Sequence, residues 1–271
     1  MAHIARKRFG QNFLHDQSVI RQIIACIGAR PGQHWVEIGP GQGALTGPLL
    51  QAGVRLDVVE LDRDLVALLK QKFAGRENFS IHSADALKFD FSALAKEGER
   101  LHIVGNLPYN ISTPLMFHLL SSAPCIEDMH FMLQKEVVER LCAEPGNKQY
   151  GRLSVMMQYD CEAEHLFDVP PESFEPAPKV MSSIVRLTPH RQRTVQVHSR
   201  ENLNRVVTHA FSQRRKTLRN SLRDLISDDE MNALAIDPKL RAENLTLEDF
   251  AKLSNLLDIE PQTEPPEGGE K

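Results

Sequence analysis

The sequence lacks any long apolar run. No segment of its 271 residues approaches the ~20 consecutive apolar residues that cross a bilayer. The first fourteen residues also lack the apolar core of a signal peptide. These absences favour a globular protein of the cytoplasm that has no membrane partner. A hydrophobic content of 41% is ample for a buried core.

Cysteine is also scarce and shows no pattern. The four cysteines stand far apart, at positions 26, 125, 142 and 161. Disulfide frameworks and zinc sites are indicated by closely spaced cysteine pairs, and none is present. We therefore expect no disulfide framework and no bound metal, and we expect the cysteines to act as small buried hydrophobic residues.

The formal net charge of -4 conceals an uneven distribution. Residues 190–223 contain nine basic residues and one acid, Glu201. Residues 259–271 are opposite in sign, with four Glu, three Pro and a single Lys. The second composition cannot bury enough apolar surface to offset the entropy of ordering, so we expect a disordered acidic tail there.

Short β-rich runs alternate with helical patterns over most of the chain. This alternation predicts an α/β fold with a parallel sheet covered by helices. Helical spacing marks Leu65–Phe73 and Pro114–Leu120, the second opened by Ser112 and Thr113. The expected strands are His34–Gly39, Arg55–Leu61, Phe79–Ser83, Leu101–Gly105 and Met129–Leu133.

Two later β-rich runs, Ala163–Val169 and Ser183–Leu187, could form an antiparallel pair at a sheet edge. After Pro189 the β character ends, and three segments have helical spacing. The sequence thus predicts a domain over residues 1–189, a helical domain over 190–258 and the tail over 259–271. The expected helices of the second domain are Asn202–Phe211, Thr217–Ile226 and Leu247–Leu257.

A hydrophobic strand runs into a glycine turn and then a helix at residues 36–46. Glycines such as Gly39 and Gly41 let a backbone approach a ligand closely. Gly39, Gly41 and Ala44 also fit the tolerant dinucleotide pattern, and Glu60 lies about 20 residues further on, where it could hold ribose hydroxyls. An NAD-linked oxidoreductase is therefore one reading of this segment.

Polar residues at successive strand ends favour S-adenosylmethionine instead. Glu37, Asp85 and Asn106 form a regular series, and such folds bind ligands at strand ends. In this interpretation the glycine turn borders the amino-acid and ribose portions, Glu60 accepts from the ribose hydroxyls and Asp85 accepts from the adenine amine. No evident acid or base for hydride transfer lies downstream.

The segment Gly105-Asn106-Leu107-Pro108-Tyr109 suits the gripping of a planar amine. An exocyclic adenine amine is a poor nucleophile, because its lone pair is delocalised into the ring. The Asn106 carbonyl and a neighbouring backbone carbonyl could accept both amine hydrogens while Tyr109 stacks on the base. The pattern predicts direct displacement of a methyl group by the amine. A surface turn after a buried strand is the alternative, because Asn and Pro are common in turns.

Taken together, four ordered motifs resemble the ribosomal RNA adenine dimethyltransferases, and the bacterial small-subunit enzymes among them most closely. The resemblance covers roughly residues 5–257 and implies a seven-stranded, Rossmann-like class I methyltransferase sheet followed by a small α-helical C-terminal domain. It also implies N6,N6-dimethylation of two adjacent adenosines near the 3′ end of 16S rRNA, with S-adenosylmethionine as donor. The motifs are residues 7–14, the glycine turn, residues 106–109 and residues 174–180.

The resemblance also assigns roles by position. Asn106, Leu107, Pro108 and Tyr109 correspond to the catalytic motif, and Phe174 is expected to stack with Tyr109 around the target base. Met181 departs from the family, which usually has an acidic residue at this position. The expected cofactor contacts are Gln11, Asn12, Leu14, Gly39, Gly41, Glu60, Leu61, Asp85, Ala86 and Asn106.

A dense basic segment follows Phe211 and is expected to form a helix that contacts RNA phosphates. Its predicted partner is 16S rRNA in the small ribosomal subunit, and a monomer is the default. A solvated helix face is the plain alternative, and Arg6, Lys7 and Arg8 could extend the basic track. The predicted RNA-binding residues are Arg214, Arg215, Lys216, Arg219 and Arg223.

Other functions remain open at this point. A large-subunit rRNA methyltransferase of the antibiotic-resistance type shares the Asn-Leu-Pro-Tyr kind of motif, but it usually ends in a more basic region. A DNA adenine methyltransferase would need a base-reading domain, and none is apparent in the short C-terminal part. A small-subunit assembly factor, in which binding matters more than catalysis, is the rival from a different class.

Overall fold

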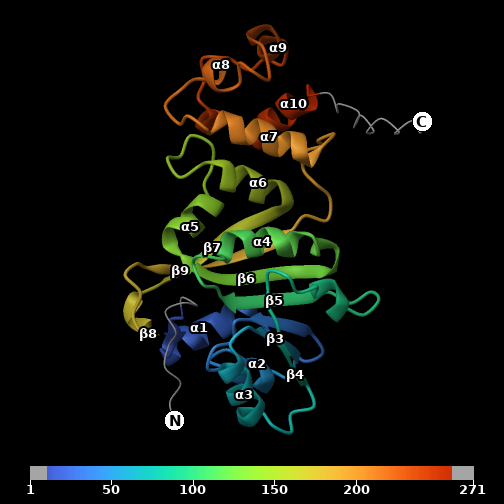
Figure 1. The fold of residues 1–271 in the computed structure, drawn as a ribbon, viewed down its shortest axis with the longest axis vertical. Helices are drawn as coiled ribbons and strands as arrows, with labels where there is room; N and C mark the ends of the chain where they lie inside the picture. The colour runs from blue at the N-terminus through green and yellow to red at the C-terminus, as the bar shows by residue number, and fades with distance from the viewer. Residues whose placement is uncertain (1–10, 258–271) are drawn as a thin grey trace, which may run out of the picture. The chain divides into compact units, whose positions relative to one another are not determined.

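The computed structural model describes residues 11–257 (Figure 1). They divide into two compact units. The first contains the described residues up to Ala143 together with Asp160–Gln192, and the second contains Glu144–Tyr159 with residues 193–257. The second unit thus includes a segment that the sequence boundary at residue 189 assigns to the first domain. The predicted tail and the basic residues 6–8 lie outside the described residues.

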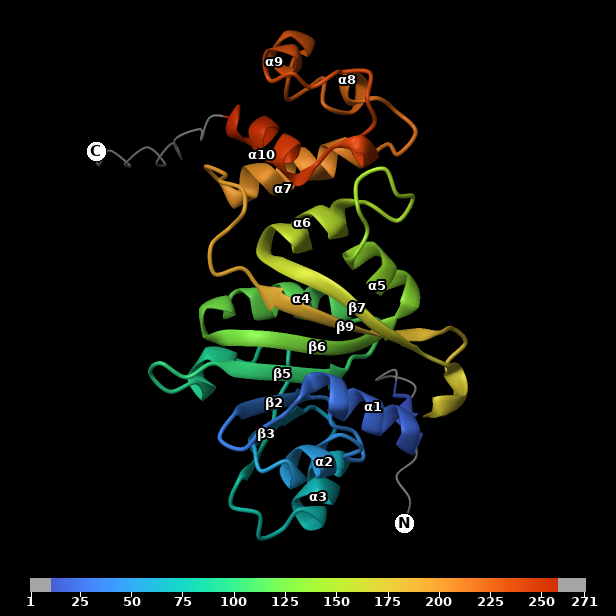
Figure 2. The same cartoon turned by 180° about the vertical axis from the view of Figure 1, so that it is seen from behind.

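The first unit is built on a seven-stranded sheet within residues 11–257, as predicted (Figures 1 and 2). Five strands run parallel, β9 runs antiparallel to β6, and β7 runs antiparallel to β9 at the edge. The order is β4-β3-β2-β5-β6-β9-β7. The bounds are β2 (His34–Ile38), β3 (Arg55–Glu60), β4 (Phe79–Ser83), β5 (Leu101–Asn106), β6 (Ile126–Gln134), β7 (Cys161–Val169) and β9 (Ser182–Pro189).

Each central strand is buried because helices cover the sheet on both faces, and this explains the nearly continuous apolar runs. All five residues of β2 are buried. In the first helix, Val19, Ile20, Ile23 and Ile27 share one buried face. The helices of this unit are α1 (Gln17–Ile27), α2 (Thr46–Gln51), α3 (Arg63–Lys72), α4 (Ser112–Leu120) and α5 (Lys135–Leu141).

Local capping positions α1. The Asp16 carboxylate accepts from the backbone N–H groups of Ser18 and Val19, and Gly28 ends the helix in the left-handed conformation. Ser173 also donates to Asp16 across 3.2 Å. The helix start is thereby joined to a loop far along the chain.

A second, two-stranded sheet pairs β1 (Phe13–Leu14) with β8 (Phe174–Glu175). Leu14 lies opposite Phe174 in this antiparallel pair. The carbonyl of Ser173 accepts from the N–H of His15 at 3.0 Å. The pairing holds the N-terminal segment beside the proline-rich loop.

The second unit is helical, but one predicted helix is wrong. Thr217–Ile226 is helical only over Leu218–Ser221, and of the basic residues before it, 214 and 215 lie in a turn and 216 lies in a bend. The N–H groups of Leu218 and Arg219 bond to the carbonyls of Leu240 and Pro238, so contact with a distant segment determines this region. The helices are α6 (Arg152–Asp160, up to Tyr159 in this unit), α7 (Arg200–Ala210), α8 (Leu218–Ser221), α9 (Asp228–Ala233) and α10 (Leu247–Asn255).

Four short 3₁₀ helices complete the secondary structure of residues 11–257: Phe91–Leu94, Ala123–Cys125, Pro171–Ser173 and Ala242–Asn244. Among these described residues, no helix is both long and apolar enough to cross a bilayer.

Candidate active site

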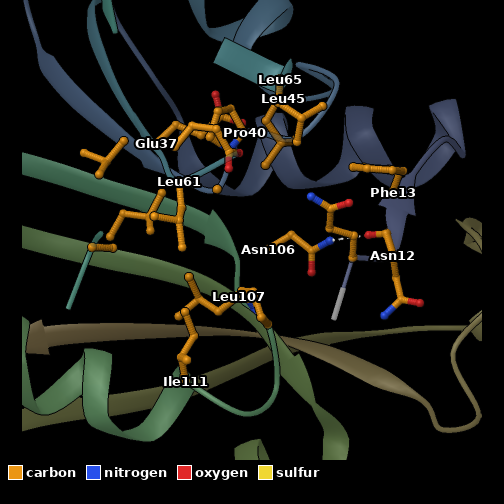
Figure 3. A pocket seen from close by; sticks show the side chains of 18 of the residues that line it. Asn12, Phe13, Glu37, Pro40, Leu45, Leu61, Leu65, Asn106, Leu107 and Ile111 are labelled. Atoms are coloured by element: carbon orange, nitrogen blue, oxygen red, sulfur yellow. Dashed lines mark hydrogen bonds between the residues drawn. The ribbon is translucent and has the colours of Figure 1, made fainter. Parts of the chain in front are cut away.

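A cavity of about 340 Å³ opens at the carboxyl ends of the parallel strands (Figure 3). The strand order reverses between β2 and β5, and open α/β sheets bind ligands at such a point. The structure brings all the predicted cofactor contacts to this cavity. Its lining includes Gln11, Asn12, Leu14, Gly39, Gly41, Glu60, Leu61, Asp85, Ala86, Asn106, Leu107, Pro108 and Tyr109.

The glycine turn after β2 forms one wall. Gly39 and Gly41 have φ values of 64° and 56°, which favour glycine. A Cβ on Gly41 would stand 3.0 Å from the Phe13 ring. Phe13 also lines the cavity, so this glycine allows the N-terminal segment to lie across the turn.

Glu60 ends β3 as a buried hydrogen-bond acceptor that is 7% exposed. Its Oε1 accepts from the N–H of Asp62 at 2.8 Å. Burial raises the pKa of Glu60, and backbone N–H groups, including that of Gly41, oppose the rise. The next side chain, Leu61, is 51% exposed and lines the cavity, so it offers apolar surface beside the carboxylate.

Glu37 is a second buried acid of the cavity, 2% exposed. Its Oε2 accepts from the Thr46 hydroxyl at 2.5 Å. Burial raises the pKa of Glu37 to about 7, against the effect of the Thr46 hydrogen bond, and the nearby Glu60 charge adds to the rise. The two acids therefore influence each other's protonation.

Asp85 lies in the turn after β4, where its Oδ1 accepts from the N–H of Leu87 at 3.0 Å. The bond fixes one side of the carboxylate. Ala86 and Leu87 also line the cavity and supply apolar surface next to this acceptor.

Asn106 ends β5 with a defined amide orientation (Figure 3). Its Nδ2 donates to the carbonyl of Asn12 at 3.0 Å, 94 positions away in sequence. The donor side of the amide is thus engaged, and Oδ1 remains as the acceptor. The N–H of Leu107 donates to the carbonyl of Met132 at 3.2 Å, which ties the motif to β6.

Tyr109 is held at both ends. Ser112 donates to the carbonyl of Tyr109 at 3.1 Å, and the hydroxyls of Tyr109 and Ser182 are 3.0 Å apart. Pro108 accepts from the N–H of Ile111 at 3.1 Å within the same turn. The turn therefore presents the tyrosine at the cavity with little freedom.

Phe174 is not among the residues that line the cavity. Its side chain is 2% exposed and belongs to the core cluster that includes Leu14 and Ile184. Pairing of β8 with β1 draws the ring into this core. Tyr109 thus lines the cavity, whereas the Phe174 ring lies in the core.

The predicted RNA-binding residues of the second unit fall into two groups. Arg219 pairs with Asp228 at 2.5 Å, Arg223 pairs with Asp224 at 3.5 Å, and Arg214 bonds to the Lys148 carbonyl and lies 3.9 Å from Glu243. Arg215 and Lys216 are exposed and have no ion-pair partner among residues 11–257. These two side chains are available to an external anion.

Sequence reasoning missed several apolar residues of the cavity. Ile111 stands two residues after the catalytic motif, and Phe13 lies between two predicted contacts, so proximity to the motifs is their only signal in the sequence. Leu45, Leu65 and Leu87 also line it and read simply as apolar positions. In the described part of the chain, no group of three or more His, Cys, Asp or Glu side chains is arranged to hold a metal ion.

The sheet and its strand-end cavity define a class I methyltransferase. Among solved structures, the chain is similar to a dimethyladenosine transferase from Plasmodium falciparum (TM-score 0.74, 26% identity, 89% of this chain and 95% of that one). It is also similar to the 23S rRNA methyltransferase ErmE (TM-score 0.71, 26% identity, 90% of this chain and 98% of that one). The fold prediction is confirmed.

Sequence comparison identifies the family. The protein-family sequence model for ribosomal RNA adenine dimethylase matches residues 2–258. The chain is 60% identical over 255 residues to the ribosomal RNA small subunit methyltransferase A of Pseudomonas aeruginosa, covering 94% of this chain and 95% of that protein. The Marinomonas sp. protein of the same name is 58% identical, with 94% and 96% covered. The chain belongs to the ribosomal RNA adenine dimethylase family, and the predicted methyltransferase activity is confirmed.

Proposed function

We propose that this protein transfers methyl groups from S-adenosylmethionine to N6 of two adjacent adenosines in the 3′-terminal hairpin of 16S rRNA, within the small ribosomal subunit. The products are N6,N6-dimethyladenosines, and the modification contributes to ribosome biogenesis in the cytoplasm. The observation that carries the proposal is the oriented Asn106 amide, whose oxygen is left as an acceptor in a cavity that also contains Glu60 and Asp85.

The residues of the cavity fit S-adenosylmethionine, which supplies an electrophilic methyl group on a sulfonium. Glu60 offers a buried carboxylate to the ribose hydroxyls, and Asp85 offers an acceptor to the adenine amine. Leu61 and Ala86 supply apolar surface for the adenine ring. The turn at Gly39 and Gly41 allows close approach of backbone to ligand.

Asn106 and Tyr109 would prepare the target amine. Asn106 Oδ1 and a neighbouring backbone carbonyl accept the amine hydrogens, which turns the nitrogen lone pair towards the methyl group. Tyr109 stacks on the base, and its ring face favours a nearby cationic centre. The alkylated amine is acidic and releases its proton to water, so this motif needs no dedicated general base.

The substrate assignment is supported by the names of the relatives and by charge. Two proteins that are 58–60% identical over nearly their whole lengths are named as small-subunit methyltransferases. The 23S rRNA methyltransferase ErmE is 26% identical. In the second unit, Arg215 and Lys216 offer exposed cations for rRNA phosphates. We further propose that the enzyme acts as a monomer, with residues 1–189 for methyl transfer, 190–258 for RNA binding and 259–271 as an acidic tail.

The similarity to ErmE favours a second candidate, methylation of a large-subunit adenosine. A third candidate is an assembly factor for which binding to the small subunit matters more than catalysis. Both candidates use the same fold, so only the substrate and the extent of methylation distinguish them.

The test is transfer of labelled methyl groups from S-adenosylmethionine to unmethylated small subunits, followed by nucleoside analysis. Naked rRNA, large subunits and duplex DNA serve as parallel substrates. We expect dimethyladenosine from small subunits. Label in large-subunit RNA would support the second candidate, and tight subunit binding without transfer would support the third.

The Asn106→Ala variant tests the catalytic assignment in the same assay. Loss of a preorganised polar group at a reacting centre costs about 10²- to 10³-fold in rate. We expect that loss with small-subunit binding retained. Full activity of the variant would contradict the proposed role of Asn106.

A further inference from the structure

We propose that Ser182 is a positioning residue that acts through Tyr109 and controls how completely the monomethylated adenosine is converted to the dimethylated product. The proposal rests on the function proposed above, because it concerns the second of two methyl transfers to one amine. Ser182 is not among the cavity-lining residues, so it would act through the tyrosine and not by contact with the substrate.

The geometry supports an anchoring role. The Ser182 and Tyr109 hydroxyls are 3.0 Å apart, and the two residues are 73 positions apart in sequence. Ser182 is 1% exposed and begins β9, where it pairs with Gln134 of β6 and Val169 of β7. A hydroxyl held between two neighbouring strands is a rigid anchor for the far end of the tyrosine ring.

The near end of Tyr109 is held separately. Ser112 donates to its backbone carbonyl at 3.1 Å, and this bond stays in place when the ring hydroxyl loses its partner. Removal of the Ser182 hydroxyl therefore frees the ring without releasing the turn. A mobile Tyr109 ring stacks less well on the base, whereas the backbone of the turn keeps its position.

The two transfers depend differently on stacking. In each, a bond forms between the amine nitrogen and the methyl carbon, the carbon–sulfur bond breaks, its electron pair returns to sulfur, and the amine later loses one proton to water. The unmodified amine offers two hydrogens to Asn106 and a backbone carbonyl, whereas the monomethylated amine offers one. With one hydrogen bond fewer, the second transfer relies more on the stacked ring of Tyr109 to hold the base.

The experiment measures monomethyladenosine and dimethyladenosine over time in small subunits treated with the full-length enzyme. Ser182→Ala removes the anchor, and Tyr109→Phe removes the same hydrogen bond from the other side. Ser183→Ala is the matched control, because Ser183 is equally buried in β9 but its hydroxyl donates to Asp168 at 2.7 Å. Ser182→Thr keeps a hydroxyl and serves as the rescue variant.

We expect Ser182→Ala to lower the rate of the second transfer roughly two- to tenfold, the range of one neutral hydrogen bond. The rate of the first transfer should change less, and the affinity for S-adenosylhomocysteine should stay the same. Tyr109→Phe should lower the rate of the second transfer to a similar extent, and the double variant should be no slower than either single variant. Ser182→Thr should recover most of the rate. Ser183→Ala should leave the ratio of the two products unchanged.

Three outcomes would overturn the proposal. They are an unchanged product ratio in Ser182→Ala, effects that multiply in the double variant, or the same ratio change in Ser183→Ala. The dimethyladenosine yield of the wild-type enzyme distinguishes a failure of this proposal from a failure of the proposed function. If wild type makes no dimethyladenosine in small subunits, the proposed function fails and the inference about Ser182 fails with it.

Discussion

At the level of single residues, the cavity combines two buried carboxyl groups, Glu37 and Glu60, with one neutral amide, that of Asn106. Glu60 ends β3 and Glu37 stands one residue before the end of the neighbouring strand β2. Both side chains are nearly inaccessible to solvent, and burial raises the pKa of each. Asn106 is neutral, and its orientation is determined by the carbonyl of Asn12. The charge of the two carboxyl groups therefore depends on pH, whereas the Asn106 amide accepts a hydrogen bond at any pH.

Glu37 gives a testable pH dependence of stability. Its pKa is about 7 in the folded protein against 4.5 for the ordinary group, so the folded state binds the proton more tightly. The resulting stability is present below pH 4.5 and is lost as the pH rises through about 7. We expect the Glu37→Gln variant to gain stability relative to wild type between pH 5 and pH 8, by up to roughly 3 kcal/mol.

Urea unfolding of both proteins at several pH values measures this difference. The glutamine variant keeps an oxygen that can accept from Thr46, so the comparison isolates the charge. If the two stability curves run parallel from pH 5 to pH 8, Glu37 does not titrate as described.

At the scale of secondary-structure elements, the site depends on how closely β2 and β5 approach. Gly105 pairs with Ile38, and a Cβ on this glycine would stand 2.7 Å from the Ile38 carbonyl oxygen. Backbone cannot move aside as a flexible side chain can. Gly105 therefore allows Asn106 to reach the cavity next to the glycine turn.

We expect Gly105→Ala to lower the free energy of unfolding by about 1–3 kcal/mol, the usual cost of overpacking. Because the strand end would shift, methyl transfer should fall as well. Gly47→Ala is the control, since Gly47 lies in α2 with no heavy atom within 4 Å of its added Cβ and should be stabilised by about 0.5–1 kcal/mol. Thermal denaturation and the methyl-transfer assay check both variants, and a neutral Gly105→Ala would show that β2 and β5 can separate without cost.

Local sequence patterns predict the bounds of the strands more accurately than those of the helices. Strands such as β4 and β3 were predicted to within a residue, because their apolar and β-branched runs are local features. The first helix, α1, was not predicted although its buried positions follow helical spacing. The helix expected over Thr217–Ile226 is helical only over Leu218–Ser221, because backbone groups of this region bond to the segment around Leu240.

At the scale of the whole molecule, charge is distributed unevenly between segments, and the net charge of -4 does not show it. In the second unit, acidic neighbours pair with Arg219 and Arg223, whereas Arg215 and Lys216 have no ion-pair partner among residues 11–257. Cations that are already paired gain less from a phosphate, because the existing pair must first be broken. The unpaired cations should contribute more to RNA binding.

We expect the double change Arg215→Ala with Lys216→Ala to weaken binding to small subunits and to reduce the slope of log affinity against log salt by about 2, near one unit for each lost phosphate contact. The matched control is Arg219→Ala with Arg223→Ala, which should change the slope less. Filter binding or surface-based kinetics at several salt concentrations gives both slopes. Equal slopes for the two double variants would contradict the distinction.

Local sequence patterns predicted the alternating strands and helices, the position of the glycine turn and the polar residues at or just after strand ends, Glu60, Asp85 and Asn106. These features depend on periodicity and short spacing, which are properties of neighbouring residues. Long-range contacts in the folded protein are what orient the Asn106 amide through Asn12, anchor Tyr109 through Ser182 and bury Phe174 in the core. Each of these contacts joins residues far apart in the chain, and local patterns contain no information about which distant side chains meet.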